Sequence, residues 1–329
     1  MAMMATPARP PIVGVLIVLT AASLFGTLGP LSRFAYDAGM EPVAFVGWRA
    51  AIGLLATAGF VWWRIAHRGR RLVGLADLDG RDRASLAVAA AIGFTLNLCM
   101  FIAFDRITVA LALLGFYTYP VMVAIANVAL GREPLDRARV VALCLAVAGM
   151  LAVVASQLDP SAGITFDVLG VGLALGAACS QAVFVLLSRS GYRAVPADQA
   201  MAVVLGVTVV SSIALAIVMG ATSTLVRPLD DPSVLPLLLF TGLFAAALPS
   251  MLFLTGIRLI GGTTTGILML FEPVVGVLLA AWLLAEGLAP IQVGGGIAIL
   301  AAALILQRAE PAGGRLVAAP AVEAEPEAA

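Results

Sequence analysis

Two ionisable side chains, Glu272 and Arg49, stand within long apolar stretches of the sequence. A charged group at the centre of a membrane-spanning helix costs about 2.5–3.5 kcal/mol on insertion scales, so we expect both to face a cavity or a partner rather than lipid. Glu272 is a candidate proton-coupling carboxylate or a contact for a solute amine. The alternative is a structural role beside Pro273, because a proline leaves a backbone carbonyl unpaired. Arg49 is a candidate to bind a solute carboxylate or to pair with Glu272. Its alternative roles are to reach the membrane interface or to join two helices.

An amide stands between two aromatic residues in another apolar stretch. Phe94, Asn97 and Phe101 are spaced by three and four residues, which places them on one face of a helix. This face suits a cavity for a small amphipathic solute, and the alternative is a hydrogen bond between helices worth about 1 kcal/mol or less. Pro249, the counterpart of Asn97 in the repeat described below, is expected to break or kink its helix.

Three aromatic side chains, Phe116, Tyr117 and Tyr119, precede Pro120. Aromatic residues usually mark the membrane interface, but these lie nearer the centre of their stretch than its ends, which favours the lining of a cavity. Pro120, Pro249 and Pro273 are candidates for gating or coupling. Weaker candidates for solute binding are polar residues in two later stretches: Gln181 and Thr265.

The composition excludes most enzymatic and cofactor chemistry. Of the 329 residues, 62% are hydrophobic and 12% are charged, against about 25% charged in a typical soluble domain, so most of the exterior must face lipid. The chain has a single histidine, and its three cysteines lack the paired spacing of a metal site or a disulfide. We therefore expect no metal, no cofactor and no enzymatic activity. Zero net charge argues against a nucleic-acid partner, and the missing P-loop excludes a primary pump.

Ten apolar stretches are long enough to cross a bilayer core of about 30 Å as helices. Their continuous apolarity excludes the alternating pattern of a transmembrane barrel. We predict an all-α polytopic membrane protein with ten transmembrane helices at these positions: Ile12–Ser32, Pro42–Trp63, Ala84–Phe104, Thr108–Leu130, Val140–Ser156, Val168–Leu187, Met201–Met219, Val234–Leu254, Thr263–Leu284 and Ile291–Leu306.

The arginines predict the orientation of these helices. With a cytoplasmic N-terminus, fifteen of the 19 arginines fall in cytoplasmic segments and three on the outer side, and Arg49 is embedded. Because cytoplasmic loops carry the excess of basic residues, both termini are predicted to be cytoplasmic in a bacterial inner membrane. The Ala/Pro/Glu-rich segment 308–329 is predicted to be disordered.

The two halves of the sequence repeat each other weakly. Pro120 is followed by an apolar run ending at Glu133, and Pro273 by one ending at Glu286, with the same spacing and an offset of 153 residues. Ser32-Arg33 ends the first stretch as Ser188-Arg189 ends the sixth. Five helices per half is an odd number, so the second half must be inverted relative to the first. Inverted repeats are typical of transporters that bind their solute between the halves near the midplane and work by alternating access.

These segments resemble a known family. YPVMVAIANVALGREPL and EPVVGVLLAAWLLAEGL, together with FVGWRAAIGLL around Arg49, are similar to the EamA-type carriers of the drug/metabolite transporter superfamily. The resemblance spans residues 12–307 and implies ten spans and cytoplasmic termini, with amino acids or related compounds as the exported solute. The chain departs from the family in the first span, SLFGTLGP, where many relatives have a tryptophan before the glycine. It also lacks a second-half counterpart of Arg49.

We therefore predict a secondary transporter built from two inverted five-helix repeats, 12–157 and 166–307, flanked by 1–11 and 308–329. Its expected partners are a small polar solute, the lipid bilayer and protons, with a homodimer contact at the glycines of the tenth span. An importer or a carrier of another solute class remains the main alternative. A membrane-embedded enzyme would need clustered His, Asp or Glu, and a scaffold would be expected to carry a large soluble domain. The sequence has neither.

Overall fold

The computed structural model describes residues 12–69, 71–132, 136–156, 167–284 and 289–308. Within this part of the chain, nine helical stretches of 19 to 29 residues are long and apolar enough to cross a membrane. The interrupted helix pair Gly262–Leu284 supplies the tenth crossing. The predicted all-α membrane fold is confirmed, and each observed span overlaps its predicted stretch. Glu133 and Glu286, which end the two repeated runs, and the segments 1–11 and 309–329 lie outside the described residues.

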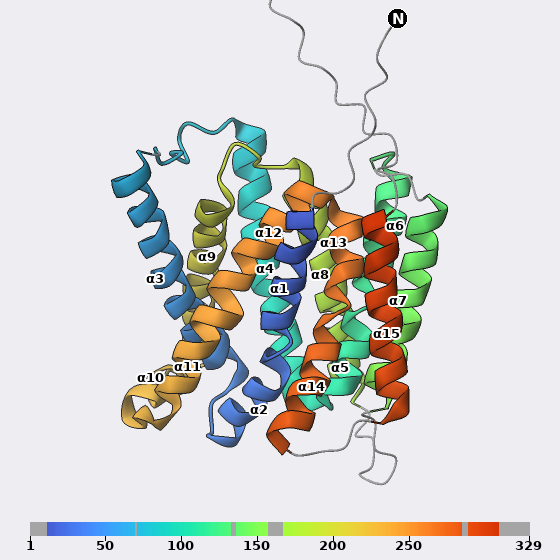
Figure 1. Cartoon of the computed structure of the whole chain (residues 1–329). Coiled ribbons are helices and arrows are strands. Elements are labelled where there is room, and N and C mark those ends of the chain that lie inside the picture. The colour runs from blue at the N-terminus through green and yellow to red at the C-terminus, as the bar shows by residue number, and fades with distance from the viewer. Residues whose placement is uncertain (1–11, 70, 133–135, 157–166, 285–288, 309–329) are drawn as a thin grey trace, which may run out of the picture.

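The first half contains five crossings, two of which are built from two helices each. The start of α1 (Ile12–Phe25) and the end of α15 (Pro290–Arg308) lie on the same side of the molecule, which is here named the terminal side (Figure 1). The helices follow in this order: α1 (Ile12–Phe25) with α2 (Leu28–Asp37), α3 (Pro42–Arg68), α4 (Gly80–Arg106), α5 (Val109–Phe116) with α6 (Tyr119–Ala129), and α7 (Arg137–Ala155).

The second half begins on the opposite side, so its crossings run inverted relative to those of the first half (Figure 1). A short helix, α10, that the sequence analysis did not anticipate lies on this opposite side, before the eighth crossing. The order is α8 (Val168–Ser190), α9 (Ala197–Val218), α10 (Thr222–Asp230), the turn η1 (Pro232–Val234), α11 (Leu235–Gly242) with the π-helical turn η2 (Leu243–Ala247) and α12 (Leu248–Ile260), α13 (Gly262–Met269) with α14 (Glu272–Leu284), and α15 (Pro290–Arg308).

Proline explains where four crossings are interrupted. A proline has no N–H and cannot bond to the carbonyl four residues earlier, so the helix loses its continuation at that carbonyl. Four positions fit this rule, each named here with the proline four residues later: Gly26 with Pro30, Phe116 with Pro120, Ala245 with Pro249, and Met269 with Pro273. Helix α5 ends at Phe116 and helix α13 at Met269, Gly26 follows the end of α1, and Ala245 lies in the π-helical turn. The interruption expected at Pro249 is thus a π-helical turn rather than a full break.

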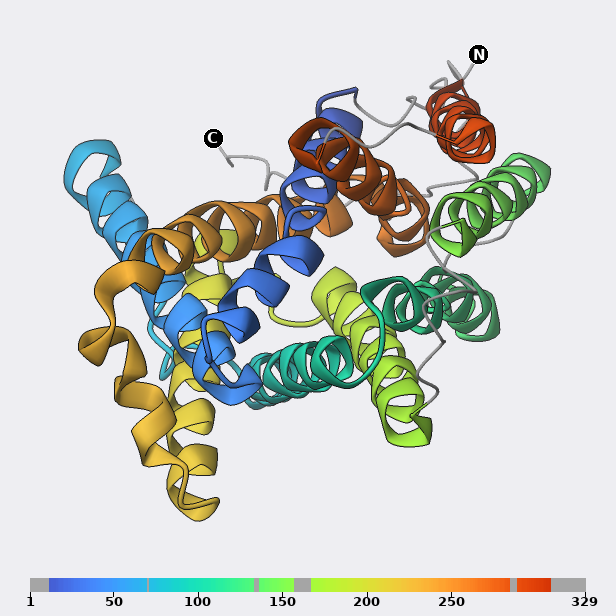
Figure 2. The ribbon, with the colours of Figure 1, turned by 90° about the horizontal axis from the view of Figure 1, so that it is seen from below.

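Helices α7 and α15, the last crossings of the two halves, pack along each other at the edge of the bundle (Figure 2). A methyl group built on Gly149 would lie 2.6 Å from the Gly295 carbonyl oxygen, and one on Gly295 would lie 2.5 Å from the Gly149 oxygen. Only glycine allows the two backbones this approach, as is common between membrane helices. Gly295 therefore packs inside the chain, whereas a methyl group on Gly294 would have no neighbour within 4 Å.

Candidate functional site

A cavity lies at the centre of the bundle, between the two halves. Its volume is about 130 Å³. Eight crossings contribute to its wall, and α7 and α15 do not. The lining from the first half is Phe25, Leu28, Arg49, Ala50, Gly93, Leu96, Asn97, Met100, Phe101, Phe104, Leu113, Phe116 and Tyr119. The lining from the second half is Gln181, Phe184, Met201, Val204, Leu205, Thr208, Ala246, Ser250, Phe253, Met269 and Glu272.

Glu272 is the only carboxylate in this lining, and it is the first residue of α14. The preceding break after Met269 exposes the start of a half-helix in the middle of the crossing. The N–H groups at a helix start are unpaired and carry partial positive charge, which favours a carboxylate there. The Glu272 carboxyl also interacts with the Tyr117 hydroxyl, although that contact lacks the geometry of a hydrogen bond. The helix break thus holds a carboxyl group at the cavity wall.

Arg49 lies in α3 and is 5% exposed. Its Nη1 donates to the Ala245 carbonyl at 2.9 Å, its Nη2 donates to Asn97 Oδ1, and the guanidinium lies 4.8 Å from the centroid of the Phe101 ring. The Ala245 carbonyl is the one that Pro249 leaves without a helical donor. Arg49 therefore satisfies a carbonyl freed in the eighth crossing and connects α3, α4 and the π-helical turn.

Arg49 does not pair with Glu272 in this structure, although that pairing was one of the roles considered for it from the sequence. The acceptors that Arg49 reaches, a carbonyl and an amide oxygen, are neutral, and its Nε has no hydrogen-bond partner among the described groups. The ion pairs of the described chain lie elsewhere: Arg64 with Asp198, and Arg106 with Asp167. One arginine and one carboxylate thus line the same cavity without neutralising each other.

Asn97 connects Arg49 to the wall of the cavity. Its Nδ2 donates to the Gly93 carbonyl at 2.8 Å, one turn earlier in α4, while its Oδ1 accepts from Arg49. The amide orientation follows from these partners, because only the oxygen can accept from a guanidinium. The Asn97 side chain therefore lines the cavity and also makes a hydrogen bond between α3 and α4.

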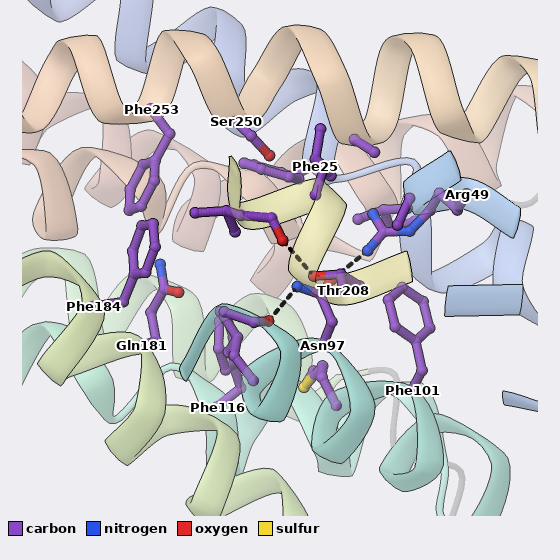
Figure 3. Close-up of a pocket in the computed structure, with 18 of the residues that line it drawn as sticks. Phe25, Arg49, Asn97, Phe101, Phe116, Gln181, Phe184, Thr208, Ser250 and Phe253 are labelled. Atoms are coloured by element: carbon purple, nitrogen blue, oxygen red, sulfur yellow. Dashed lines mark hydrogen bonds between the residues drawn. The ribbon is translucent and has the colours of Figure 1, made fainter. Parts of the chain in front are cut away.

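Aromatic rings make up much of the remaining wall. Figure 3 shows Phe184 and Phe253 on one side of the cavity and Arg49 with Asn97 and Phe101 on the other. Phe25 packs edge-on against Phe253 with ring centroids 6.4 Å apart. Aromatic faces attract cations and pack against other rings, so this wall suits an amphipathic solute with an amine.

The structure brings seven of the residues predicted from the sequence to this cavity: Arg49, Asn97, Phe101, Phe116, Tyr119, Gln181 and Glu272. Six others do not line it: Phe94, Tyr117, Thr265, Pro120, Pro249 and Pro273. Phe94 lies outside the lining because the face of α4 toward the cavity contains Gly93 and Asn97, and the next residue after Gly93 points in another direction. Thr265 is fully buried within α13. The three prolines act on the backbone and shape the breaks around the cavity.

Several lining residues were missed, and the repeat held a signal for some of them. Phe253 stands 152 residues after Phe101, and Ser250 stands 153 residues after Asn97, next to the Pro249 assigned as its counterpart. Carrying the first-half candidates across by an offset of 152 or 153 residues would have found both. Phe184 and Thr208 had no such signal, because nothing in an apolar helix marks which face meets a cavity.

No group of three or more metal-binding side chains occurs among the described residues. The polar groups of the cavity are instead one carboxylate, one guanidinium, two amides, two hydroxyls of serine and threonine, and one phenol. This set can bind a small charged or polar solute by hydrogen bonds and ion pairs.

Comparison with known proteins agrees with this geometry. The sequence profile of the EamA-like transporter family matches residues 12–155 and again residues 168–308. Curated proteins give no match. Among solved structures 28 chains match, and one, titled "Crystal structure of protein", has a TM-score of 0.70 and 18% sequence identity over 89% of this chain and 96% of its own. That likeness concerns the fold. The repeated family match covers nearly all of the bundle that surrounds the cavity, and the chain belongs to the EamA-like transporter family.

Proposed function

We propose that this membrane transporter exports amino acids or closely related zwitterions through the central cavity. The observation that carries the proposal is the placement of a carboxyl group, Glu272, and a guanidinium, Arg49, in one aromatic-lined space between the halves, with neither in an ion pair among the described residues. A zwitterion supplies the opposite charge for each group. Its amine binds Glu272 and its carboxylate binds Arg49.

Solutes dominated by phosphate fit the cavity less well. Arg49 is the only basic residue in the lining, and it already donates to Ala245 and Asn97. A doubly charged phosphate beside Glu272 would meet one cation and one like charge. A neutral sugar would leave the Arg49 guanidinium without a counter-charge, which is unfavourable where water is largely excluded.

The two inverted halves support alternating access, because the cavity is shared between them. The excess of arginine on the terminal side supports a cytoplasmic location for that side, and hence a bacterial inner-membrane protein with both termini inside. Export is the direction implied by the resemblance of the motifs to EamA-type carriers. Import would use the same cavity, and transport assays in oriented vesicles distinguish the two directions.

Glu272 also supports coupling to protons. A carboxyl that binds either a proton or a solute amine, but not both, links the movement of the two. If Glu272→Gln kept a transport rate that follows an imposed pH gradient as in the parent, this coupling would be excluded. Solute binding at Arg49 would be unaffected by that result.

Thermal stabilisation by ligands tests the solute class. The purified protein is melted with amino acids, polyamines, nucleobases and sugars, and a ligand at a hundredfold excess over its Kd stabilises the folded state by about 2.7 kcal/mol. We expect stabilisation by amino acids that is lost in Glu272→Gln. Glu41→Gln is the matched control, because Glu41 is an exposed carboxylate outside the cavity. Stabilisation by sugars alone, or amino-acid binding unchanged in Glu272→Gln, would contradict the proposal.

A further inference from the structure

A five-residue motif, Ser-Arg-x-x-Tyr, occurs in equivalent places of the two halves. Ser32, Arg33 and Tyr36 form the first Ser-Arg-Tyr motif, near the end of α2. Ser188, Arg189 and Tyr192 form the second, at the end of α8. Because the halves are inverted, the first lies on the opposite side of the molecule and the second on the terminal side (Figure 1).

In the second motif, the arginine caps the end of another crossing. Arg189 Nη1 donates to the Ile257 carbonyl at 3.0 Å and to the Arg258 carbonyl at 2.6 Å. Both carbonyls lie in the last turn of α12, where a helix leaves its carbonyls without intrahelical donors. A cation there also interacts favourably with the negative end of the helix dipole. Arg189 thus ties α8 to α12 on the terminal side.

In the first motif, the arginine makes the equivalent contact. Arg33 Nη2 donates at 2.7 Å to the carbonyl of Ile107, the residue that caps the end of α4. Helix α4 is the first-half counterpart of α12, since each is the third crossing of its half. The same contact is therefore made once on each side of the molecule, between equivalent crossings.

The tyrosines differ between the two sides. Tyr192 is fully buried, and its hydroxyl shares a hydrogen bond with Ser188 Oγ. Tyr36 is half-buried and donates to the Phe101 carbonyl at 2.9 Å, beside the cavity wall. Tyr192 also has a φ of 40°, the one positive value among the non-glycine residues described. Such a backbone persists only where its surroundings hold it, so the buried tyrosine is under strain.

The arginine that ends the third crossing of each half, Arg258 or Arg106, binds its neighbouring loop on the terminal side only. Arg258 Nη1 donates to the Val195 carbonyl at 2.7 Å and Nη2 to the Tyr192 carbonyl at 3.2 Å, which binds the segment between α8 and α9 to the end of α12. Its first-half counterpart, Arg106, is exposed and pairs with Asp167 instead. On the opposite side the loop after α2 is bound instead by Arg227, whose Nε and Nη2 donate to the Ala38 carbonyl at 3.2 and 3.1 Å. The two sides thus differ in the contact made by Arg258 and not by Arg106.

We propose that the two Ser-Arg-Tyr motifs are the gates of the transport cycle, one for each side of the membrane. In the structure the gate at Ser188–Tyr192 is closed. The gate at Ser32–Tyr36 lacks the contact between Arg106 and the loop after α2. The change of access exchanges the two: Arg258 releases the loop after α8, while Arg106 leaves Asp167 and binds the loop after α2. This rests on the proposed function only in requiring alternating access and does not depend on which solute is carried.

Side-specific labelling of a cavity cysteine tests the gates. Ser250 lines the cavity, so Ser250→Cys is placed in a background in which Cys99, Cys144 and Cys179 are replaced by alanine. A membrane-impermeant maleimide is then added to one side or the other of reconstituted vesicles without any solute. The quantity measured is the ratio of labelling rates from the terminal side and from the opposite side.

The two arginines should change this ratio in opposite directions. A lost charge-assisted hydrogen bond is expected to shift the ratio about tenfold. Arg189→Gln should raise labelling from the terminal side, and Arg33→Gln should raise labelling from the opposite side. Arg83→Gln is the control, because Arg83 also donates to a backbone carbonyl on the terminal side, that of Leu78, but lies outside both motifs.

A purely structural role for the motifs predicts a different result. If the arginines only cap helices, both variants lower the melting temperature while the labelling ratio stays at the parental value. That outcome, or a shift of both variants in the same direction, would overturn the proposal. Arg258→Gln, expected to act like Arg189→Gln, gives a second reading should Arg189→Gln fail to fold. Because the assay contains no solute, a failed gate is distinguishable from a wrong solute class.

Discussion

Replacing Arg49 tests whether the network around the cavity holds three crossings together. Arg49→Met removes the charge but keeps most of the side-chain volume. It deletes two hydrogen bonds from a charged donor, worth about 1.5–3 kcal/mol each, and a cation–π contact worth about 0.5–2 kcal/mol. Relief from burying a guanidinium that has no acidic partner offsets part of this, by several kcal/mol. We expect a net destabilisation of about 2–4 kcal/mol, or about 4–8 °C in melting temperature.

A double-mutant cycle isolates the contact between Arg49 and Asn97. Asn97→Leu, a replacement of similar shape, should alone cost about 1.5–3 kcal/mol because it leaves a charged donor without its acceptor. The double variant should be less destabilised than the sum of the single variants, with a coupling of about 1–3 kcal/mol. The destabilisation of each of the three variants is measured by thermal melting in one detergent, with intrinsic fluorescence as the signal.

The control for this cycle is Arg83→Met, since Arg83 is exposed and bonds to a carbonyl at the surface. It should change stability by no more than about 0.5 kcal/mol. Additive effects of Arg49→Met and Asn97→Leu would refute the reasoning, because residues that share a buried hydrogen bond must be coupled. A stabilised Arg49→Met variant would mean that the buried charge outweighs all of its contacts.

Two further outcomes follow from contacts away from the cavity. Gly149→Val should destabilise the protein by about 1–3 kcal/mol, because any side chain there meets the Gly295 carbonyl, whereas Gly294→Val should leave the melting temperature unchanged. Burial alone would raise the pKa of Asp167, but hydrogen bonds from Arg106 and from a backbone N–H hold it below its usual value. A lowered carboxyl pKa contributes stability above the unfolded value of about 3.9 that is lost as pH falls further. The melting temperature of the parent should therefore exceed that of Asp167→Asn at pH 7 and converge with it as the pH falls below the lowered pKa of Asp167; equal values at pH 7 would show that the pair contributes nothing.

The ten crossings could be predicted because the bilayer imposes the rule that reveals them. A backbone in lipid must satisfy its own hydrogen bonds, so each crossing is a helix and must be apolar over its length. The odd number of crossings per half then requires inversion. The helix breaks at Phe116 and Met269 could also be predicted from the sequence, since Pro120 and Pro273 stand four residues later. Pro30 has the same effect on the first crossing and was overlooked.

The partners of the polar side chains could not be predicted. Whether Arg49 meets Glu272 or Ala245 depends on the rotation of α3 against its neighbours, and an apolar helix carries almost no pattern that records rotation. Phe94 shows the same limit, because a turn of one residue decides between cavity and bundle. The contribution of Phe184 to the cavity wall could likewise not be predicted, since a phenylalanine side chain can face lipid as well as a cavity.

Counterflow in reconstituted vesicles tests the central claim, that a zwitterion crosses through the cavity at Glu272. Vesicles loaded with an unlabelled amino acid are placed in a trace of the labelled one, and accumulation of label measures exchange through the protein. We predict accumulation by the parent and by Glu41→Gln, and a loss of at least about tenfold in Glu272→Gln, which removes the charge that binds the amine. Exchange by Glu272→Gln at the parental rate, with the variant folded and correctly inserted, would contradict the account.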